Sequence, residues 1–167
     1  MKPLSLSALM LVALATTSPV SAIPVTGLLD PALREAAPAS APTMAAVVDP
    51  YLRVQGKLAV DTIDGIKADA TAIAAAASKL GKDGAPVVTA ARQLEAATTI
   101  DAARVAFESV TTALFAYADA TKTDLGTDVR RTYCPMEKKS WAQKNGEIMN
   151  PYAGKTMQHC GVFTDKK

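Results

Sequence analysis

Two long stretches of the chain carry apolar residues at helical spacing, and this pattern constrains the fold more than any other feature. Apolar residues recur at intervals of 3, 4, 3, 4 and 3 residues in each stretch. Such spacing places one apolar stripe along one face of an α-helix, which must then be buried against a neighbour. The stripes consist of Ile63, Ile66, Ala70, Ile73, Ala77 and Leu80, and of Ile100, Ala103, Phe107, Val110, Leu114 and Tyr117.

Capping signals indicate where the helices begin. Asp49 followed by Pro50 predicts a helix start, with the aspartate as N-cap and the proline in the first helical position. A third helix is predicted from Pro86, and Thr98 or Thr99 is the expected N-cap of the fourth. The apolar positions of the first and third helices are Tyr51, Val54 and Leu58, and Val87, Ala91 and Leu94. Short later connections favour antiparallel neighbours, so the predicted class is all-α, an antiparallel four-helix bundle over residues 47–122.

The first 22 residues have the layout of a secretory signal peptide. Lys2 supplies the positive start, Leu4 to Ala15 is apolar, and Val20-Ser21-Ala22 ends in small residues. The apolar run is shorter than the roughly 20 residues that span a bilayer. We therefore expect cleavage after Ala22, a periplasmic or secreted mature protein, and no stable membrane insertion.

Residues 23–46 contain four prolines among alanines and serines, and this composition predicts a flexible tether. The formal net charge is only +2, and Lys2 is lost with the signal peptide. A mature chain of such low net charge lacks the excess of lysine and arginine that binds phosphates, so nucleic acid is not an expected partner.

Residues 123–167 differ in composition from the helical part. They hold both cysteines, the only tryptophan and the only histidine of the chain. Asn145-Gly146 and Asn150-Pro151 are turn signals. We predict a small C-terminal loop or β-hairpin lobe that carries the two cysteines, with Trp141, Tyr152 and Phe163 as its apolar anchors.

The sulfur atoms of this lobe allow two interpretations. Cys134 with Met136, and Met157 with Cys160, would supply two thiolates and two thioethers, which select soft ions such as Cu(I) or Ag(I). His159 is a further possible ligand. Alternatively, Cys134 and Cys160 form a disulfide, which an exported chain permits. The sequence contains no C-x-x-C pair, phosphate-binding loop or HExxH motif, so we do not expect an enzyme.

The segment YCPMEKKSWAQKNGEIMNPYAGKTMQHCG resembles the signature of an exported bacterial domain family of unknown function, also found fused to adaptor subunits of heavy-metal efflux pumps. The matching positions are Cys134, Pro135, Met136, Trp141, Glu147, Ile148, Asn150, Pro151, Tyr152, Gly154, Met157, Cys160 and Gly161. The match covers about thirty residues. Tyr133 stands where many members have histidine, and Gln158 stands where they often have leucine.

The resemblance implies a role in metal handling. Cys134, Met136, Met157 and Cys160 become the expected metal ligands, and the surrounding lobe would be shaped by Trp141, Asn150, Pro151, Tyr152 and Gly154. A captured soft ion would pass by ligand exchange to a heavy-metal efflux component. The competing function is an interaction module that docks on another envelope protein, binds no metal, and has its tail held by a Cys134–Cys160 disulfide.

Overall fold

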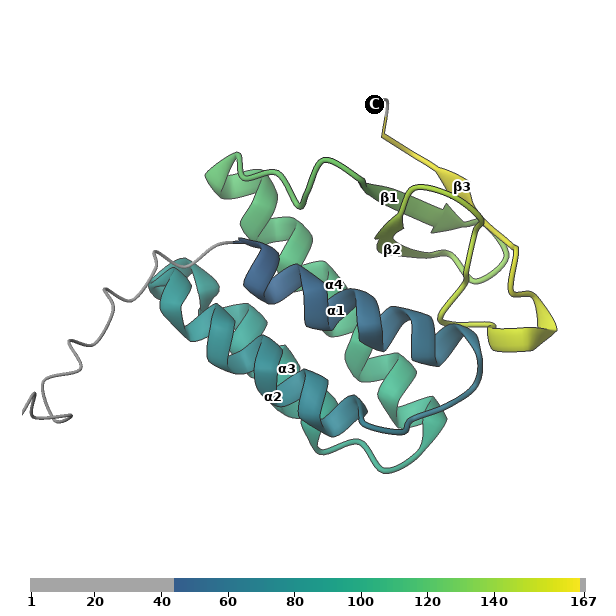
Figure 1. Ribbon diagram of the computed structural model, residues 1–167, viewed down its shortest axis with the longest axis horizontal. Helices are drawn as coiled ribbons and strands as arrows, with labels where there is room; N and C mark the ends of the chain where they lie inside the picture. The colour runs from purple at the N-terminus through teal and green to yellow at the C-terminus, as the bar shows by residue number, and fades with distance from the viewer. Residues whose placement is uncertain (1–43, 166–167) are drawn as a thin grey trace, which may run out of the picture. The chain divides into compact units, whose positions relative to one another are not determined.

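The computed structural model describes residues 44–165 (Figure 1). The predicted signal peptide and most of the predicted tether lie outside these residues. The described part holds four α-helices, α1 Met44–Ala59, α2 Ile66–Ala77, α3 Ala85–Glu95 and α4 Ile100–Thr121. Three strands follow, β1 Val129–Cys134, β2 Lys139–Lys144 and β3 Val162–Phe163. Short 3₁₀ turns occupy Ser78–Leu80, Lys82–Gly84 and Gly154–Thr156.

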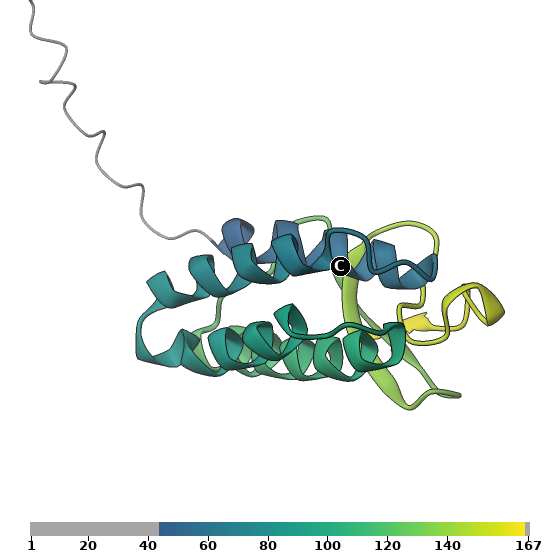
Figure 2. The same ribbon diagram turned by 90° about the horizontal axis from the view of Figure 1, so that it is seen from below.

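Successive helices pack against each other, and α1 also contacts α4. Figure 2 shows α1 and α2 on one side and α3 and α4 on the other. The sheet is antiparallel with strand order β2-β1-β3, and it contacts α1 and α4 through β2 (Figure 1). The prediction of a helix-rich chain with a small cysteine-bearing lobe is therefore confirmed, and the lobe contains a three-stranded sheet.

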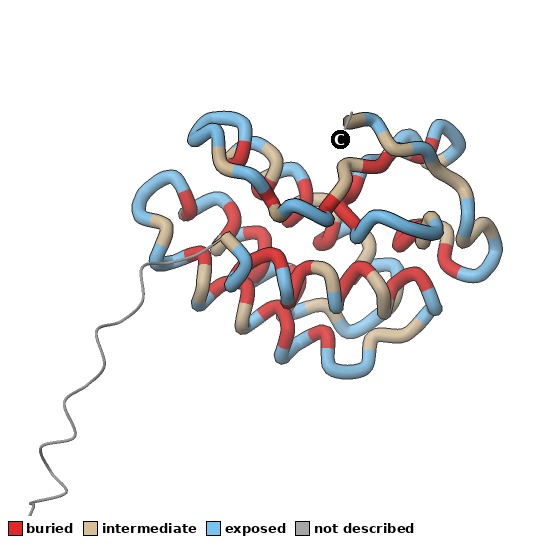
Figure 3. Tube along the Cα trace, turned by 45° about the horizontal axis from the view of Figure 1, so that its top comes forward, coloured by how far each residue is buried: buried red, intermediate tan, exposed pale blue. Residues whose placement is uncertain are grey.

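The predicted apolar stripes form the core. Figure 3 shows buried positions recurring along the helices. The centres of both long stripes are buried, whereas their outermost members are only partly buried; Ile63 lies in the loop before α2 and Leu80 in the 3₁₀ turn after it, so the predicted stripe is longer than the helix. The partly buried members are Ile63, Leu80, Ile100 and Tyr117. Thr99 is the N-cap of α4, as predicted, and its side chain accepts a hydrogen bond from the Ala102 amide at 3.2 Å.

The first helix begins earlier than predicted. Pro50 lies inside α1 rather than at its start, and Met44–Ala46 are helical although the expected tether extended to residue 46. Proline at this position removes one backbone hydrogen bond to the preceding turn. Val47 and Val48 are buried in that turn, and burying an aliphatic side chain contributes about 1.5–3 kcal/mol. This burial offsets the missing hydrogen bond.

The β-hairpin turn does not lie at the Asn145-Gly146 turn signal. β1 and β2 are joined by residues 135–138, with Lys138 at a φ of 53°, and not by Asn145-Gly146. Pro135 cannot donate a hydrogen bond to a strand ladder, so β1 ends at Cys134. Asn145 instead lies at the open end of the hairpin, where its backbone N–H donates a hydrogen bond to the Asp128 carbonyl at 2.8 Å.

Candidate functional site

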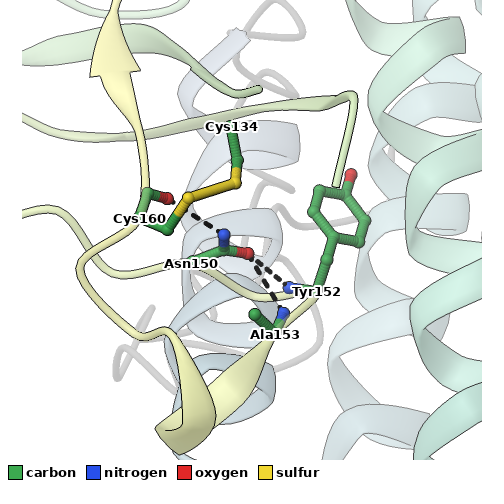
Figure 4. The surroundings of a disulfide bond; sticks show 5 residues. All are labelled: Cys134, Asn150, Tyr152, Ala153 and Cys160. Atoms are coloured by element: carbon green, nitrogen blue, oxygen red, sulfur yellow. Dashed lines mark hydrogen bonds between the residues drawn. A yellow bond between two sulfur atoms is a disulfide. The ribbon is translucent and has the colours of Figure 1, made fainter. Parts of the chain in front are cut away.

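The two cysteines are joined in a disulfide between the end of β1 and the residue two before β3 (Figure 4). The Cα atoms of Cys134 and Cys160 lie 5.7 Å apart. Cys134 is fully buried, and Cys160 is partly exposed. Both sulfur atoms therefore take part in a covalent bond in this oxidised form of the protein. A thiolate is the form that attacks or ligates, and neither residue supplies one until the bond is reduced.

Strand pairing and one glycine bring the cysteines together. β1 pairs with β3 through Tyr133 opposite Val162 and Thr132 opposite Phe163. Gly161 lies between Cys160 and β3, and a Cβ atom there would collide with the Trp141 ring. Only glycine permits this close approach of the backbone to the indole. The buried Trp141 therefore sets the path of the chain that presents Cys160 to Cys134.

Asn150 organises the loop that returns to the disulfide (Figure 4). Its side chain is buried, and its carboxamide oxygen accepts hydrogen bonds from the amides of Tyr152 and Ala153 at 2.8 and 3.2 Å. The carboxamide nitrogen donates to the Cys160 carbonyl at 3.0 Å. The backbone amide of Asn150 donates to the Gln158 carbonyl at 2.7 Å. One side chain thus shapes the Asn-Pro-Tyr turn and ties it to the backbone of a disulfide cysteine.

Two tyrosine hydroxyls cover the outer edge of β2. Tyr152 donates to the Ser140 carbonyl at 2.8 Å, and the Ala142 amide donates to the Tyr51 hydroxyl at 3.0 Å. Burial raises the pKa of both tyrosines well above the usual range, so the hydroxyls remain protonated. A buried backbone N–H or carbonyl without a hydrogen-bond partner raises the free energy of the fold. The two tyrosine hydroxyls supply partners for the Ser140 carbonyl and the Ala142 amide of β2.

Trp141 is positioned by a residue that sequence reasoning missed. The indole N–H donates to the Gln143 carboxamide oxygen at 2.9 Å, and the Met149 amide donates to the same oxygen at 3.0 Å. The Gln143 amide group in turn donates to the Glu147 carbonyl at 2.8 Å. The sequence did contain a signal for this residue. Gln143 follows Trp141 by two positions in a strand, and side chains at that spacing lie on the same face.

A second missed group clamps the lobe to the helices. Arg104 of α4 donates to the Pro151 carbonyl at 2.9 Å and forms an ion pair with Asp61. Asp61 also accepts from the Lys155 amide at 3.0 Å. Gly154, at a φ of 54°, has no room for a Cβ atom beside Asp61 and Arg104. No sequence motif marks these contacts, because they join residues that lie 43 or more positions apart.

Asp61 is the charged group of this clamp. Hydrogen bonds from the Lys155 amide and the Arg104 guanidinium hold the pKa of the Asp61 carboxyl below its usual range. The carboxylate form is therefore the one that the folded lobe favours. The contact depends on pH because protonation would remove the charge that Arg104 recognises.

The methionine and histidine residues of the predicted ligand set lie near the two cysteines in the sequence and differ in their exposure. Met136 lies in the β1–β2 turn and is 72% exposed, whereas Met157 is partly buried. His159 is exposed, with its Nδ1 atom 3.0 Å from the Ile148 carbonyl and 3.4 Å from a Glu147 carboxylate oxygen. Within residues 44–165, no three His, Cys, Asp or Glu side chains form a metal-binding group. The mixed Cys and Met set remains a prediction.

Comparisons with protein-family models, with curated proteins and with solved structures find no match to this chain. The resemblance of the C-terminal segment to an exported domain family therefore stays a prediction. Among residues 44–165, no helix combines the length and apolar character that crossing a membrane requires.

Replacing Asn150 by alanine should destabilise the protein by at least about 2 kcal/mol, because each buried group left without its partner costs roughly 1–3 kcal/mol. The groups affected are the amides of Tyr152 and Ala153 and the carbonyl of Cys160. Urea unfolding measures the difference. Asn145→Ala in the exposed turn is the control and should change the stability by less than about 0.5 kcal/mol. Equal effects of the two substitutions would contradict the role of Asn150.

The Asp61→Asn variant should lose stability in a pH-dependent way. Because folding lowers the pKa of Asp61, the charged group stabilises the fold above the unfolded pKa of about 4. This contribution disappears as the pH falls through the lowered folded-state pKa. Unfolding free energies should therefore differ between wild type and Asp61→Asn at pH 7 and converge as the pH falls through the lowered folded-state pKa. A difference that stays constant over this pH range would show that the clamp does not require the charge.

Proposed function

We propose that the protein is an extracytoplasmic interaction module, a binding protein rather than an enzyme. The four helices act as an antiparallel bundle that serves as scaffold, and the C-terminal lobe is held by the Cys134–Cys160 disulfide. This disulfide is the observation that carries the proposal. Disulfides persist in oxidising compartments outside the cytoplasm, and the bond leaves neither cysteine free for catalysis or metal ligation.

The contact surface that we propose is a groove on α3 and α4. It has a volume of about 590 Å³, and its lining consists of Pro86, Val105, Glu108, Ser109, Thr112, Ala113 and Ala116. Val105 is 63% exposed, and it is one of few large apolar side chains exposed within the described residues. The single charged residue of the lining, Glu108, is paired with Lys139 at 3.0 Å. A groove of such low charge suits the apolar face of a helix from an envelope protein.

Site-specific photo-crosslinking in the exporting cell tests this function. A photoreactive benzoylphenylalanine in place of Val105 should give one discrete adduct with an envelope protein. The same residue in place of the exposed Lys67 on α2 should give none. Adding Ala116→Glu should abolish the Val105 adduct, because it introduces an unpaired charge into the groove. Absence of any adduct, or the same adducts from both positions, would refute the interaction module.

A second function, capture of a soft metal ion by the reduced lobe, is favoured by the position of Met136. Its exposed thioether lies two residues after Cys134, and the Cys160 amide donates to the Met157 carbonyl at 3.0 Å. Reduction with two electrons and two protons converts the disulfide into two thiols, and these lose their protons on binding a metal. Two thiolates with two thioethers suit Cu(I) or Ag(I), with His159 as an additional ligand and a heavy-metal efflux component as the receiver.

Native intact mass spectrometry separates the two functions. The interaction module predicts a chain two hydrogens lighter than the dithiol form, and no metal uptake when Cu(I) is added under mild reductant. Metal capture predicts a reduced chain carrying one copper, lost in Cys134→Ser and weakened in the Met136→Leu, Met157→Leu double variant. Met149→Leu is the matched control and should retain the metal. Copper affinity that is unchanged in the double variant would show that the thioethers are not ligands.

A further inference from the structure

The chain contains two asparagines, and the structure places them in opposite environments. Asn150 is buried, and three hydrogen bonds join its carboxamide to the backbone. Asn145 follows the last residue of β2, and both it and Gly146 are exposed. Neither proposed function uses Asn145 or Gly146, and this pair does not form the hairpin turn.

Only one long hydrogen bond restrains the Asn145 carboxamide within residues 44–165. Its oxygen lies 3.4 Å from the Nη1 atom of Arg130, beyond the roughly 2.7–3.2 Å typical of such bonds. Arg130 directs its Nε atom to the Asp165 carboxylate at 2.8 Å and its Nη2 atom to the Asp165 carbonyl at 2.5 Å. The Asn145 carboxamide nitrogen donates to no described residue. The side chain can therefore rotate at little cost.

Gly146 places an accessible backbone nitrogen directly after this side chain. Its N–H donates to no described residue. Its φ of 142° lies in a region that other residues rarely adopt, and apart from its chain neighbours no atom lies within 4 Å of the position that a Cβ would take. Neither a hydrogen bond of the Gly146 N–H nor crowding at its α-carbon therefore opposes the approach of this nitrogen to the Asn145 carboxamide carbon.

We propose that Asn145 is a site of spontaneous deamidation, with Gly146 and water as the reactants; asparagine is among the thermolabile residues. The Gly146 nitrogen loses its proton and attacks the carboxamide carbon of Asn145, and the carboxamide nitrogen leaves as ammonia. One water molecule then opens the resulting five-membered succinimide ring at either of its two carbonyl groups. One opening gives aspartate, and the other gives isoaspartate. The reaction consumes one water, releases one ammonia and involves no oxidation.

Asn150 cannot follow the same route. Its successor is Pro151, whose nitrogen carries no hydrogen and cannot close the ring. Its carboxamide is also fixed by the hydrogen bonds to Tyr152, Ala153 and Cys160. One asparagine of the chain is thus protected and the other is open to the reaction.

The modification changes the contacts at the open end of the hairpin. A carboxylate at position 145 lies beside Arg130, so a long hydrogen bond between neutral and charged groups becomes an ion pair. Isoaspartate also lengthens the backbone between Lys144 and Glu147, whose carbonyls accept hydrogen bonds from Gln143 at 3.2 and 2.8 Å. The lobe therefore gains one negative charge at a position independent of the disulfide and of the groove on α3 and α4.

Mass spectrometry of the full chain after incubation in mildly alkaline water labelled with heavy oxygen tests this site. The tryptic peptide 145–155 holds both asparagines, and its fragment ions separate them. Heavy oxygen should enter position 145, in both the aspartate and the isoaspartate forms, and should not enter position 150. A chain that stays unlabelled at position 145, or that carries equal label at the two positions, would overturn the proposal.

The chain reduced and unfolded in urea gives the rate that the same sequence has without its fold. The folded chain should convert within tenfold of this reference rate, because the fold leaves both reacting groups of Asn145 and Gly146 accessible. A folded chain that converts more than tenfold slower would show that the structure protects Asn145, and this result would refute the site.

Variants identify the attacking nitrogen. Gly146→Ala should slow the conversion at least tenfold in the folded and in the unfolded chain, because the added methyl group hinders ring closure. Glu147→Gln, one position further along, is the matched control and should leave the rate unchanged. Conversion of Gly146→Ala at the wild-type rate in both states would show that the ring does not form through this nitrogen and would refute the proposal.

Discussion

The hydroxyl of Tyr51 connects the two halves of the structure, and the rest of the fold depends on it. This oxygen lies 2.8 Å from the Thr111 hydroxyl of α4 and accepts from the Ala142 amide of β2 at 3.0 Å. The Tyr51 ring stacks on Phe107 with centroids 4.8 Å apart. One buried side chain therefore links α1, α4 and the sheet. Without it, β2 would bury an unpaired amide, which costs about as much as a lost hydrogen bond.

The C-terminal lobe buries few large apolar side chains, and polar contacts and a covalent bond add to its stability. Trp141 and Tyr152 supply its buried rings, while Asn150 and Gln143 satisfy the backbone of its loops. The disulfide closes 26 residues, and restricting the unfolded chain in this way stabilises a fold by roughly 3.5 kcal/mol. The Arg104–Asp61 clamp then fixes the lobe on the helices. The lobe is thus held on the helical scaffold by ion-pair and hydrogen-bond contacts.

Each proposed activity uses a different part of this scaffold. The proposed docking groove lies on α3 and α4, and its one charged lining residue, Glu108, is paired with Lys139. The sulfur atoms lie in the lobe, where the redox state determines whether a bond or a pair of thiolates is present.

The sequence by itself determined which regions are helical and the Thr99 cap, because periodic apolar spacing and capping are local signals, but it did not determine where α1 begins. It located the lobe but misplaced its hairpin turn, since Asn-Gly is a strong local signal, whereas the ending of β1 at Pro135 depends on which strand it pairs with. It also left open whether Cys134 and Cys160 bind a metal or each other. Tertiary structure decided that question for this state by placing their Cα atoms 5.7 Å apart. Only tertiary structure could reveal the Arg104–Asp61 clamp, because these residues, distant in the chain, become neighbours solely through packing.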